Sequence, residues 1–301
     1  MKKALALILT ASLLTGVLTA CGSSEAQTDA AETTTEEAAA EETAATADTD
    51  AQAETGDLQV ITVAATAVPH AEILEAAKPI LAEQGYDLQV TVFDDYVQPN
   101  EVVEAGDIDC NYFQHIPYLN SYNEERGTHL VSVGEIHYEP IGIYAGTESD
   151  LSNIPDGADI AIPNDTTNEA RALLILQDNG IITLKEGAGI DATINDIAEN
   201  PHNINFVEME AAQVSKVLSE VAFAVINGNY ALDAGLNAQT DALASETSDS
   251  LAAQTYVNVV VVKEGNEDNE GVKALVNVLK SDDIKKFIEE TYEGAVVPFE
   301  G

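Results

Sequence analysis

The sequence predicts an α/β protein of two lobes, with a ligand cleft between the lobes and two hinge crossovers joining them. Three observations support this fold class. Apolar, β-branched runs alternate with helical stretches, which is typical of βαβ units and parallel sheets. Two long extended runs, at residues 129–146 and 255–265, lie where the chain would pass from one lobe to the other. Roughly 240 residues follow the N-terminal region, and that length suits one large or two medium cores.

The first twenty residues are expected to be a signal peptide for secretion. Lys2 and Lys3 precede an uncharged apolar run at residues 4–14, which is too short to span a bilayer. Leu-Thr-Ala at residues 18–20 directly precedes Cys21 and matches the bacterial lipoprotein processing box. We therefore expect Cys21 to receive a diacylglyceryl group and to anchor the protein to the membrane. An ordinary signal peptide with an incidental cysteine is the alternative.

Residues 21–57 are expected to hold the lipidated cysteine and a disordered acidic spacer. The stretch 22–57 contains no aromatic residue and no Leu, Ile, Val or Met, so it cannot bury enough apolar surface to fold. The whole chain has 12 Lys and Arg against 53 Asp and Glu, a formal charge of −41. This charge argues against nucleic acid as a partner, because binding phosphates requires basic patches.

The folded region is predicted to divide into a first lobe of residues 58–138 plus 259–301 and a second lobe of residues 139–258. For the first lobe, the pattern predicts strands at 58–66 and 87–95 and helices at 69–83, 99–106, 116–126, 269–280 and 282–291. For the second lobe, it predicts strands at 157–165 and 223–229 and helices at 166–180 and 211–220. The two extended runs would pair as crossovers, with the cleft at the carboxyl ends of the strands. One continuous sheet is the alternative.

Arg171 is the first candidate for ligand binding. The chain has only two arginines, and Arg126 ends a helix beside two glutamates, which indicates a solvated charge. Arg171 instead lies one turn into a helix that follows a buried strand, where free N–H groups already favour anions. Its planar guanidinium would suit a carboxylate, and Asn168 would lie on the same helix face. A surface arginine paired with a neighbouring carboxylate is the alternative.

Residues 109–120, DCNYFQHIPYLN, combine three aromatic residues with His115. In a chain with only 5% aromatic residues, this mixture favours an apolar slot with a few directional donors over a regular core segment. A structural hydrogen-bonding role is the alternative for His115. Asn227 and Asn229, in AVINGNYA, would place amides at the carboxyl end of a strand, where they can bind a ligand ammonium or carboxylate, although Asn-Gly-Asn turn chemistry explains them nearly as well.

Motifs for catalysis and for metal binding are absent from the sequence. The five histidines form neither HExxH nor a close pair, and there is no Asp-x-Asp-x-Asp-Gly loop. G-x-S-x-G, Walker A and G-x-G-x-x-G patterns are missing as well. The sequence therefore predicts no metal site, no cofactor and no enzymatic activity. A metal receptor would need three or four His, Asp or Glu ligands converging in the cleft, and a hydrolase would need a nucleophile–base pair.

Six segments together resemble the methionine-binding lipoprotein family, the substrate-binding components of methionine ABC importers. In the order of the family they are PHAEIL (69–74), FDDYVQPNEVVEAGDID (93–109), NYFQHIPYL (111–119), PNDTTNEARALLILQ (163–177), AVINGNYALDAGL (224–236) and GAVVPF (294–299). The resemblance runs from about Ile61 to Phe299. It implies a periplasmic-binding-protein-like fold, in which two lobes close on a ligand.

The resemblance also implies ligand-binding roles for eight residues. Arg171 would hold the ligand α-carboxylate with Asn168 beside it, and the amino-acid head group would also contact Asn227 and Asn258. The side-chain pocket would be walled by Tyr96, Phe113, His115 and Tyr118, since aromatic rings make favourable contacts with a thioether sulfur. The stretch DSLAAQTYVN (249–258) departs from the compact Asp-Ser-Pro-Tyr-x-Asn turn of the family, and this departure bears directly on Asn258.

The function that the resemblance implies is solute capture. The protein would be lipid-anchored through Cys21 on the extracytoplasmic face of the cell membrane. It would bind methionine and deliver it to an ABC permease, with a separate ATPase driving transport. A receptor for another small amino acid, or for a methionine-containing dipeptide, is the alternative.

Overall fold

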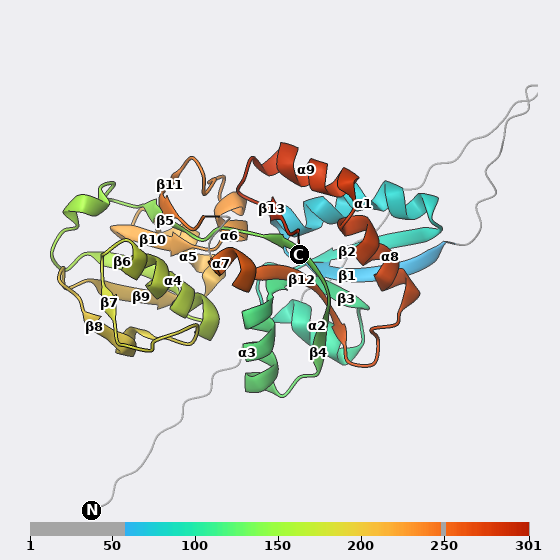
Figure 1. Ribbon diagram of the computed structural model, residues 1–301, viewed down its shortest axis with the longest axis horizontal. Helices are drawn as coiled ribbons and strands as arrows, with labels where there is room; N and C mark the ends of the chain where they lie inside the picture. The colour runs from blue at the N-terminus through green and yellow to red at the C-terminus, as the bar shows by residue number, and fades with distance from the viewer. Residues whose placement is uncertain (1–57, 248–250, 301) are drawn as a thin grey trace, which may run out of the picture. The chain divides into compact units, whose positions relative to one another are not determined.

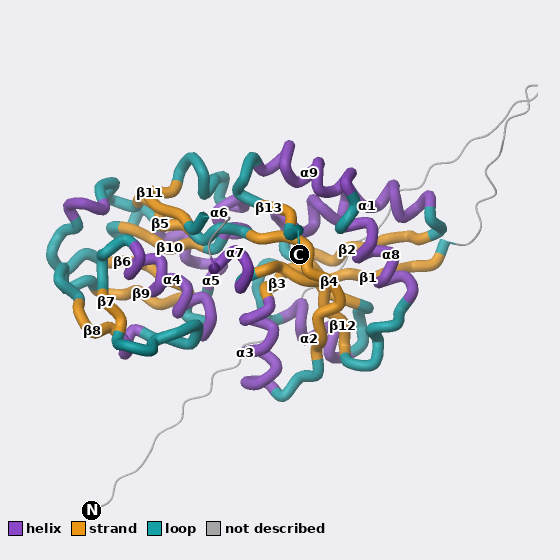
Figure 2. Tube along the Cα trace, in the orientation of Figure 1, coloured by secondary structure: helices purple, strands orange, loops and turns teal. Residues whose placement is uncertain are grey.

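The computed structural model describes residues 58–247 and 251–300. The signal peptide, Cys21 and the acidic spacer predicted for residues 1–57 lie outside the described residues. Within the described part, the chain forms two main sheets with helices packed against them (Figures 1 and 2). None of the described helices is long and apolar enough to cross a membrane.

The first sheet has the strand order β13-β4-β12-β3-β1-β2. Its strands are β1 (Gln59–Ala65), β2 (Tyr86–Val92), β3 (Cys110–His115), β4 (Leu130–Tyr138), β12 (Val257–Lys263) and β13 (Val297–Pro298). β1 pairs in parallel with β2 and β3, whereas β12 runs antiparallel to β3 and β4. The predicted parallel sheet is thus found in only part of this lobe, because β12 returns from the other lobe and enters the sheet in the opposite direction.

Helices cover both faces of the first sheet. One face carries α1 (Glu72–Glu83), α8 (Glu270–Leu279) and α9 (Asp282–Tyr292), and the other carries α2 (Gln98–Ala105) and α3 (Ile116–Arg126). Successive valines of β12 point to opposite faces of the sheet. Val260 and Val262 pack in the core with α1 and α8, whereas Val259 and Val261 pack in the core with α2 and α3. This alternation explains why β12 reads as a continuous apolar run, since a strand buried on both faces needs no polar side.

The second sheet has the strand order β11-β5-β10-β6-β9. Its strands are β5 (Gly142–Ala145), β6 (Asp159–Pro163), β9 (Asn205–Met209), β10 (Phe223–Ile226) and β11 (Ala242–Ser245). The helices that accompany it are α4 (Thr166–Asp178), α5 (Ala211–Val214), α6 (Gly228–Asp233) and α7 (Leu251–Thr255), and a small hairpin is formed by β7 (Thr183–Leu184) and β8 (Ile197–Glu199). Short helical turns complete the chain at η1 (Ala67–Ala71), η2 (Leu151–Asn153), η3 (Ile194–Asp196) and η4 (Ser215–Val217).

Several predicted elements differ from the structure. The helix expected at 211–220 is a single α-turn continued by the 3-10 turn η4. The strand expected at 223–229 ends at Ile226, and α6 begins at Gly228, because Asn227 turns the chain from extended to helical geometry. The pattern did not predict β3. This strand is buried along its whole length, but several of its residues are polar, and polar residues do not indicate a buried strand.

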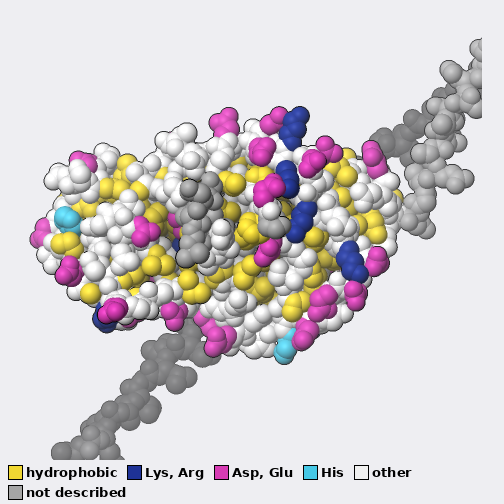
Figure 3. Space-filling model, viewed as in Figure 1, with side chains coloured by type: hydrophobic (Ala, Val, Ile, Leu, Met, Phe, Trp, Pro, Cys, Tyr) yellow, Lys and Arg dark blue, Asp and Glu magenta, His cyan; other side chains and the backbone are white. Residues whose placement is uncertain are grey.

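The two extended runs pair as expected for crossovers. β12 lies antiparallel beside β4, with Val257 opposite Tyr138, and β4 continues into β5 of the second sheet. The two sheets share no strand pair, so the alternative of one continuous sheet is wrong. In Figure 1 the first sheet lies at the right and the second at the left, with α7 between them. The surface shown in Figure 3 carries Asp and Glu side chains scattered over both lobes, which is the solvated arrangement that repelling carboxylates favour.

Candidate functional site

A single pocket between the lobes brings together all eight residues predicted from the sequence. The first lobe contributes Tyr96, Phe113, His115 and Tyr118, together with Asn258 of the returning strand. The second lobe contributes Asn168, Arg171 and Asn227. The pocket is also lined by Asn229, which the sequence offered as a candidate beside Asn227, and by three residues that were not predicted: Gln114, Glu139 and Gly228. The free volume among these side chains is only about 20 Å³, about the room for one water molecule.

The aromatic wall comes from β3, α3 and the loop before α2. The ring centroids of Tyr96 and Phe113 lie 5.8 Å apart, and those of Tyr96 and Tyr118 lie 5.6 Å apart. Strand alternation places Phe113 on the α2–α3 side of the sheet, opposite to Tyr112, and there it lines the pocket. A β-bulge lies at the same place: β12 pairs Val259 with Gln114 and Val260 with Tyr112, so Phe113 is the extra residue.

His115 joins the two lobes through Asn168. Its Nδ1 accepts the backbone N–H of Tyr118 at 3.1 Å, so Nε2 carries the proton and donates to Asn168 Oδ1 at 3.1 Å. Burial, and then the charge of Arg171, lower the pKa of His115 to about 3, which keeps the ring neutral. Asn168 is held in turn by Asp165, the N-cap of α4, whose carboxylate accepts from the Asn168 backbone and amide nitrogens.

Asn227 presents an unsatisfied acceptor to the pocket. Its Nδ2 donates to Asn168 Oδ1 at 2.7 Å, but Asn227 Oδ1 is buried without a hydrogen-bond partner among the described residues. A buried acceptor left unpaired costs free energy comparable to a lost hydrogen bond. Because this oxygen belongs to a residue that lines the pocket, it suits a donor group supplied by a ligand.

Arg171 is not the free carboxylate fork that the sequence suggested. Its Nε donates to Glu246 Oε1 at 2.9 Å, and its Nη2 donates to Glu246 Oε2 at 2.5 Å and to the Glu139 carbonyl at 2.8 Å. The alternative was a surface arginine paired with a carboxylate. Arg171 is indeed paired with a carboxylate, that of Glu246, but it is buried and does not lie on the surface. Burial alone would lower the pKa of the guanidinium, but Glu246 outweighs it and raises that pKa. Arg126, as expected, is half exposed and lies 3.7 Å from Glu101.

Glu139 is one of the lining residues that sequence reasoning missed, and it supplies the only carboxylate among the described residues of this pocket. Burial raises the pKa of Glu139, while His70, Arg171 and the Asn229 backbone N–H oppose that increase. Gly228 makes room for this side chain. A Cβ at position 228 would lie 2.7 Å from Glu139 Cβ and 3.0 Å from its Oε2. No local motif marks Glu139, since apart from His137 the residues that surround its carboxylate come from distant parts of the chain.

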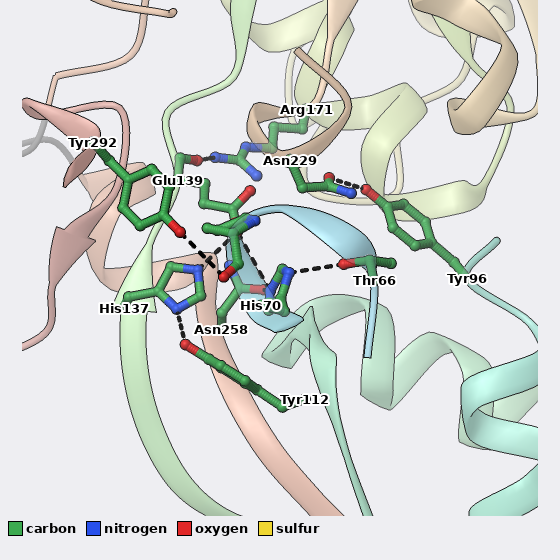
Figure 4. A network of polar contacts seen from close by, with 11 residues as sticks. Thr66, His70, Tyr96, Tyr112, His137, Glu139, Arg171, Asn229, Asn258 and Tyr292 are labelled. Carbon is green, nitrogen blue, oxygen red and sulfur yellow. Dashed lines mark hydrogen bonds and ion pairs between the residues drawn. The ribbon is translucent and has the colours of Figure 1, made fainter. Parts of the chain in front are cut away.

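Two buried histidines flank the Glu139 carboxylate (Figure 4). His137 Nε2 donates to Glu139 Oε1 at 2.7 Å, and its Nδ1 accepts from the Tyr112 hydroxyl. His70 Nε2 lies 3.1 Å from Asn258 Oδ1 and 3.4 Å from Glu139 Oε1, and its Nδ1 lies 2.8 Å from Thr66 Oγ1. Burial lowers the pKa of His70 to about 4 and that of His137 to about 3, so both rings are neutral near pH 7.

This cluster bears on the metal-receptor alternative. One ligand atom from each of His70, His137 and Glu139 lies within 4.8 Å of the others, a convergence that the sequence did not predict. Each ring nitrogen already has an oxygen partner, however, and the 2.7 Å contact to Glu139 is a hydrogen-bond distance. The arrangement therefore fits a hydrogen-bonded network that fixes Glu139 and Asn258 better than it fits an open metal site.

Hydrogen bonds close the cleft around the pocket. Besides the His115–Asn168 bond, Tyr96 donates its hydroxyl to Asn229 Oδ1 at 2.5 Å, and Tyr230 donates to the Asp94 carbonyl at 3.0 Å. Each such bond contributes only about 0.5–1.5 kcal/mol. A larger cavity of about 220 Å³ adjoins the pocket through Tyr96 and Tyr118. We take the smaller pocket as the site, because polar groups from both lobes converge there and one of its buried acceptors lacks a partner.

Comparisons with known proteins match nearly the whole described part of the chain. The family profile described as NlpA lipoprotein matches residues 61–300. The methionine-binding lipoprotein MetQ of Bacillus subtilis (strain 168) is 41% identical over 250 residues, which cover 82% of this chain and 90% of that protein.

Solved structures agree with that match. The crystal structure of a protein from Ruminococcus gnavus ATCC 29149 is 67% identical, has a TM-score of 0.80, and is covered over 100% of its length by 80% of this chain. The structure of a nutrient-binding protein from Burkholderia cenocepacia bound to methionine is 42% identical with a TM-score of 0.75, covering 79% of this chain and 99% of that one.

Proposed function

The chain belongs to the NlpA lipoprotein family, and on that premise we propose that it is a receptor that captures methionine outside the cell for an ABC importer. Cys21 would carry the lipid that holds the receptor at the extracytoplasmic face of the membrane. The closed, loaded form would dock on a permease, and a separate ATPase would drive transport. The protein would bind its ligand and release it unchanged, without catalysis.

The unpaired Asn227 Oδ1 is the observation that carries the proposal. Together with the Glu139 carboxylate, it gives the pocket two acceptors suited to an α-ammonium group. Arg171 and Asn168 lie in the same pocket and would meet the α-carboxylate. Acceptors beside donors match a zwitterionic head group, in which an ammonium and a carboxylate group are bonded to the same carbon atom.

The side chain of the ligand would lie against the ring cluster of Tyr96, Phe113 and Tyr118. Methionine suits such a wall because its thioether is polarizable and makes favourable contacts with aromatic rings, worth about 0.3–1.5 kcal/mol. Among the described residues that line the pocket, the charged side chains are Arg171 and Glu139, which the head group would occupy, so none is left to pair with a charged ligand side chain. The same argument admits other small apolar amino acids, which remain the alternative ligands.

Binding requires the lobes to separate and close again. The free volume of about 20 Å³ cannot hold methionine in the described conformation. The crossover at residues 139–141 and the described residues 251–256 before β12 are the links that would bend, while the two sheets move as units. The hydrogen bonds between the lobes are few and individually weak, so ligand contacts could decide the balance between open and closed forms.

Calorimetric titration tests this function against its rivals. The protein should bind methionine at one site per chain, more tightly than leucine, glutamate or lysine. Zn²⁺ should give no stoichiometric binding, because the nitrogens of His70 and His137 are already engaged. Binding of Zn²⁺ without binding of methionine would overturn the proposal in favour of a metal receptor. Tighter binding of a methionine-containing dipeptide would change the ligand but not the class.

A further inference from the structure

We propose that Glu246 determines how this pocket recognises the carboxyl group of its ligand. Because Glu246 occupies two donor nitrogens of Arg171, the site would require the ammonium group of the ligand but would not require its carboxyl group to be charged. Methionine derivatives with an uncharged carboxyl group, such as the primary amide, would then bind nearly as well as methionine. This inference rests on the proposed amino-acid binding at the same pocket.

The geometry of the pair limits what Arg171 can offer. Nε and Nη2 face the two carboxylate oxygens of Glu246, and Nη2 also donates to the Glu139 carbonyl. Nη1 is therefore the one guanidinium nitrogen without a hydrogen-bond partner among the described residues. A ligand carboxyl group would meet a single nitrogen rather than a two-pronged fork. A single N–H donor can bond a neutral carbonyl oxygen in the same geometry as one oxygen of a carboxylate, whereas a two-pronged fork requires both carboxylate oxygens.

Glu246 is a fixed part of the fold and would not readily give way to a ligand. Its Oε2 accepts from the Tyr138 hydroxyl at 2.5 Å and from the Ile141 backbone N–H at 3.1 Å. Its own backbone N–H donates to the Ile141 carbonyl at 3.1 Å. The Tyr256 ring packs on the guanidinium, with its centroid 4.3 Å from Arg171 Cζ. Displacing Glu246 would leave a buried N–H and a hydroxyl unpaired, which opposes exchange with a ligand carboxylate.

Charge strengthens the asymmetry between the two ends of the head group. Arg171 and Glu246 form a pair of zero net charge, with side chains only 4% and 10% exposed. A ligand carboxylate beside this pair gains little net attraction from it. The ammonium end, by contrast, meets the Glu139 carboxylate and the unpaired Asn227 oxygen. Loss of the ammonium group should therefore cost far more affinity than neutralisation of the carboxylate.

Three ligands of nearly equal size test the inference on the wild-type protein. They are methionine, methioninamide and 4-(methylthio)butanoate, which lacks the amino group, and they are compared by calorimetry at about pH 6, where the α-ammonium groups are charged. We expect the amide to bind within about tenfold of methionine and the butanoate to lose about a hundredfold or more. Rejection of the amide by more than about a hundredfold would overturn the inference and leave methionine binding itself intact. Absence of methionine binding would overturn both proposals.

The variant Glu246→Gln isolates the residue, and exposed Glu186→Gln is its matched control. Loss of the Glu246 charge frees the Arg171 charge for the ligand, so the preference for methionine over its amide should rise by about tenfold or more. Glu186→Gln should leave that ratio unchanged. A merely structural role for Glu246 would weaken both ligands equally, and an unchanged ratio in the folded variant would overturn the inference. If Glu246→Gln does not fold, the three-ligand comparison on the wild type decides alone.

Discussion

At the scale of the residue, a substitution at Glu139 tests the proposed chemistry most directly. The variant Glu139→Gln keeps the size of the side chain but removes the charge that would hold the ligand ammonium. Methionine affinity should fall by tens- to a thousandfold, corresponding to about 2–5 kcal/mol for a buried charged partner. Glu101→Gln is the control, because Glu101 belongs to an exposed ion pair of little energetic value. Equal affinities in the two variants would remove Glu139 from the site.

The pH dependence of binding follows from the same carboxylate. Burial raises the pKa of Glu139, and only its ionised form attracts an ammonium group. As the pH falls through this raised pKa, Glu139 takes up a proton and methionine affinity should decrease. The decrease should begin at a higher pH than an exposed carboxylate would give. His70 and His137, with pKa values of about 4 and 3, stay neutral over the upper part of this range. Calorimetry at decreasing pH measures this effect, and a wild-type affinity that begins to fall no earlier than an exposed carboxylate would dictate contradicts this account.

Phe113 belongs to a pocket and to a core at the same time. It is 3% exposed, packs with Val103 and Leu119, and also lines the ligand pocket. Phe113→Ala should therefore lower the free energy of unfolding by about 3–5 kcal/mol and weaken methionine binding by about 1–3 kcal/mol. Phe113→Leu should restore most of the stability but not the contact of the ring with sulfur. Chemical denaturation and calorimetry separate the two effects, and wild-type affinity in Phe113→Leu would show that the ring makes no specific contact.

Sequence reasoning at the residue scale found candidates that local patterns mark and missed those that they do not. Arg171 stands out because it follows a strand and opens a helix, and Phe113 because aromatics are rare in this chain. Glu139 carries no such mark, being one of 53 acidic residues. The partner of Arg171 was also out of reach, since Glu246 lies 75 residues away in the chain. Pairing over that distance is set by the fold, and no spacing rule describes it.

At the scale of the element, the start of α6 positions the Glu139 carboxylate. Gly228 opens this helix, and a methyl group there would collide with Glu139 Cβ at 2.7 Å. Gly228→Ala should therefore displace Glu139 and reduce methionine affinity by about tenfold or more, with a smaller loss of stability. Gly189→Ala is the control, because its Cβ would meet nothing closer than 3.7 Å. Calorimetry on both variants gives the comparison, and equal affinities would mean that the backbone yields and Glu139 stays in place.

Elements with strong periodicity were predictable, and elements shaped by their neighbours were not. The helix predicted at 116–126 matches α3 at both ends, because Pro117 and Gly127 mark its limits. β3 escaped prediction because its polar residues Asn111 and Gln114 bond to Asn100 of α2 inside the protein. The bulge at Phe113 also breaks the alternation that identifies a strand. Polar pairing and bulges depend on the neighbouring strand, and a single segment does not reveal them.

At the scale of the whole molecule, the lipid anchor and the pocket should act independently. Cys21 lies outside the described residues, and the sequence separates it from β1 by an acidic stretch, residues 22–57, without aromatic residues and without Leu, Ile, Val or Met. Cys21→Ser should therefore release the protein from the membrane without changing its affinity for methionine. Membrane fractionation with a carbonate wash checks the first part, and calorimetry checks the second. Retention of the variant in the washed membranes would contradict the lipoprotein assignment.

A crystal structure of the protein grown with methionine tests the central claim most directly. We predict one methionine in the pocket between the two sheets, with its ammonium group within hydrogen-bonding distance of Glu139 and Asn227 Oδ1. Its carboxylate should reach Arg171 through Nη1 alone, with Glu246 still on the opposite edge, and its sulfur should lie against Phe113. Methionine bound elsewhere, for example in the cavity of about 220 Å³ beside Glu125 and Glu210, would contradict this account, as would a head group turned so that its ammonium faces Arg171.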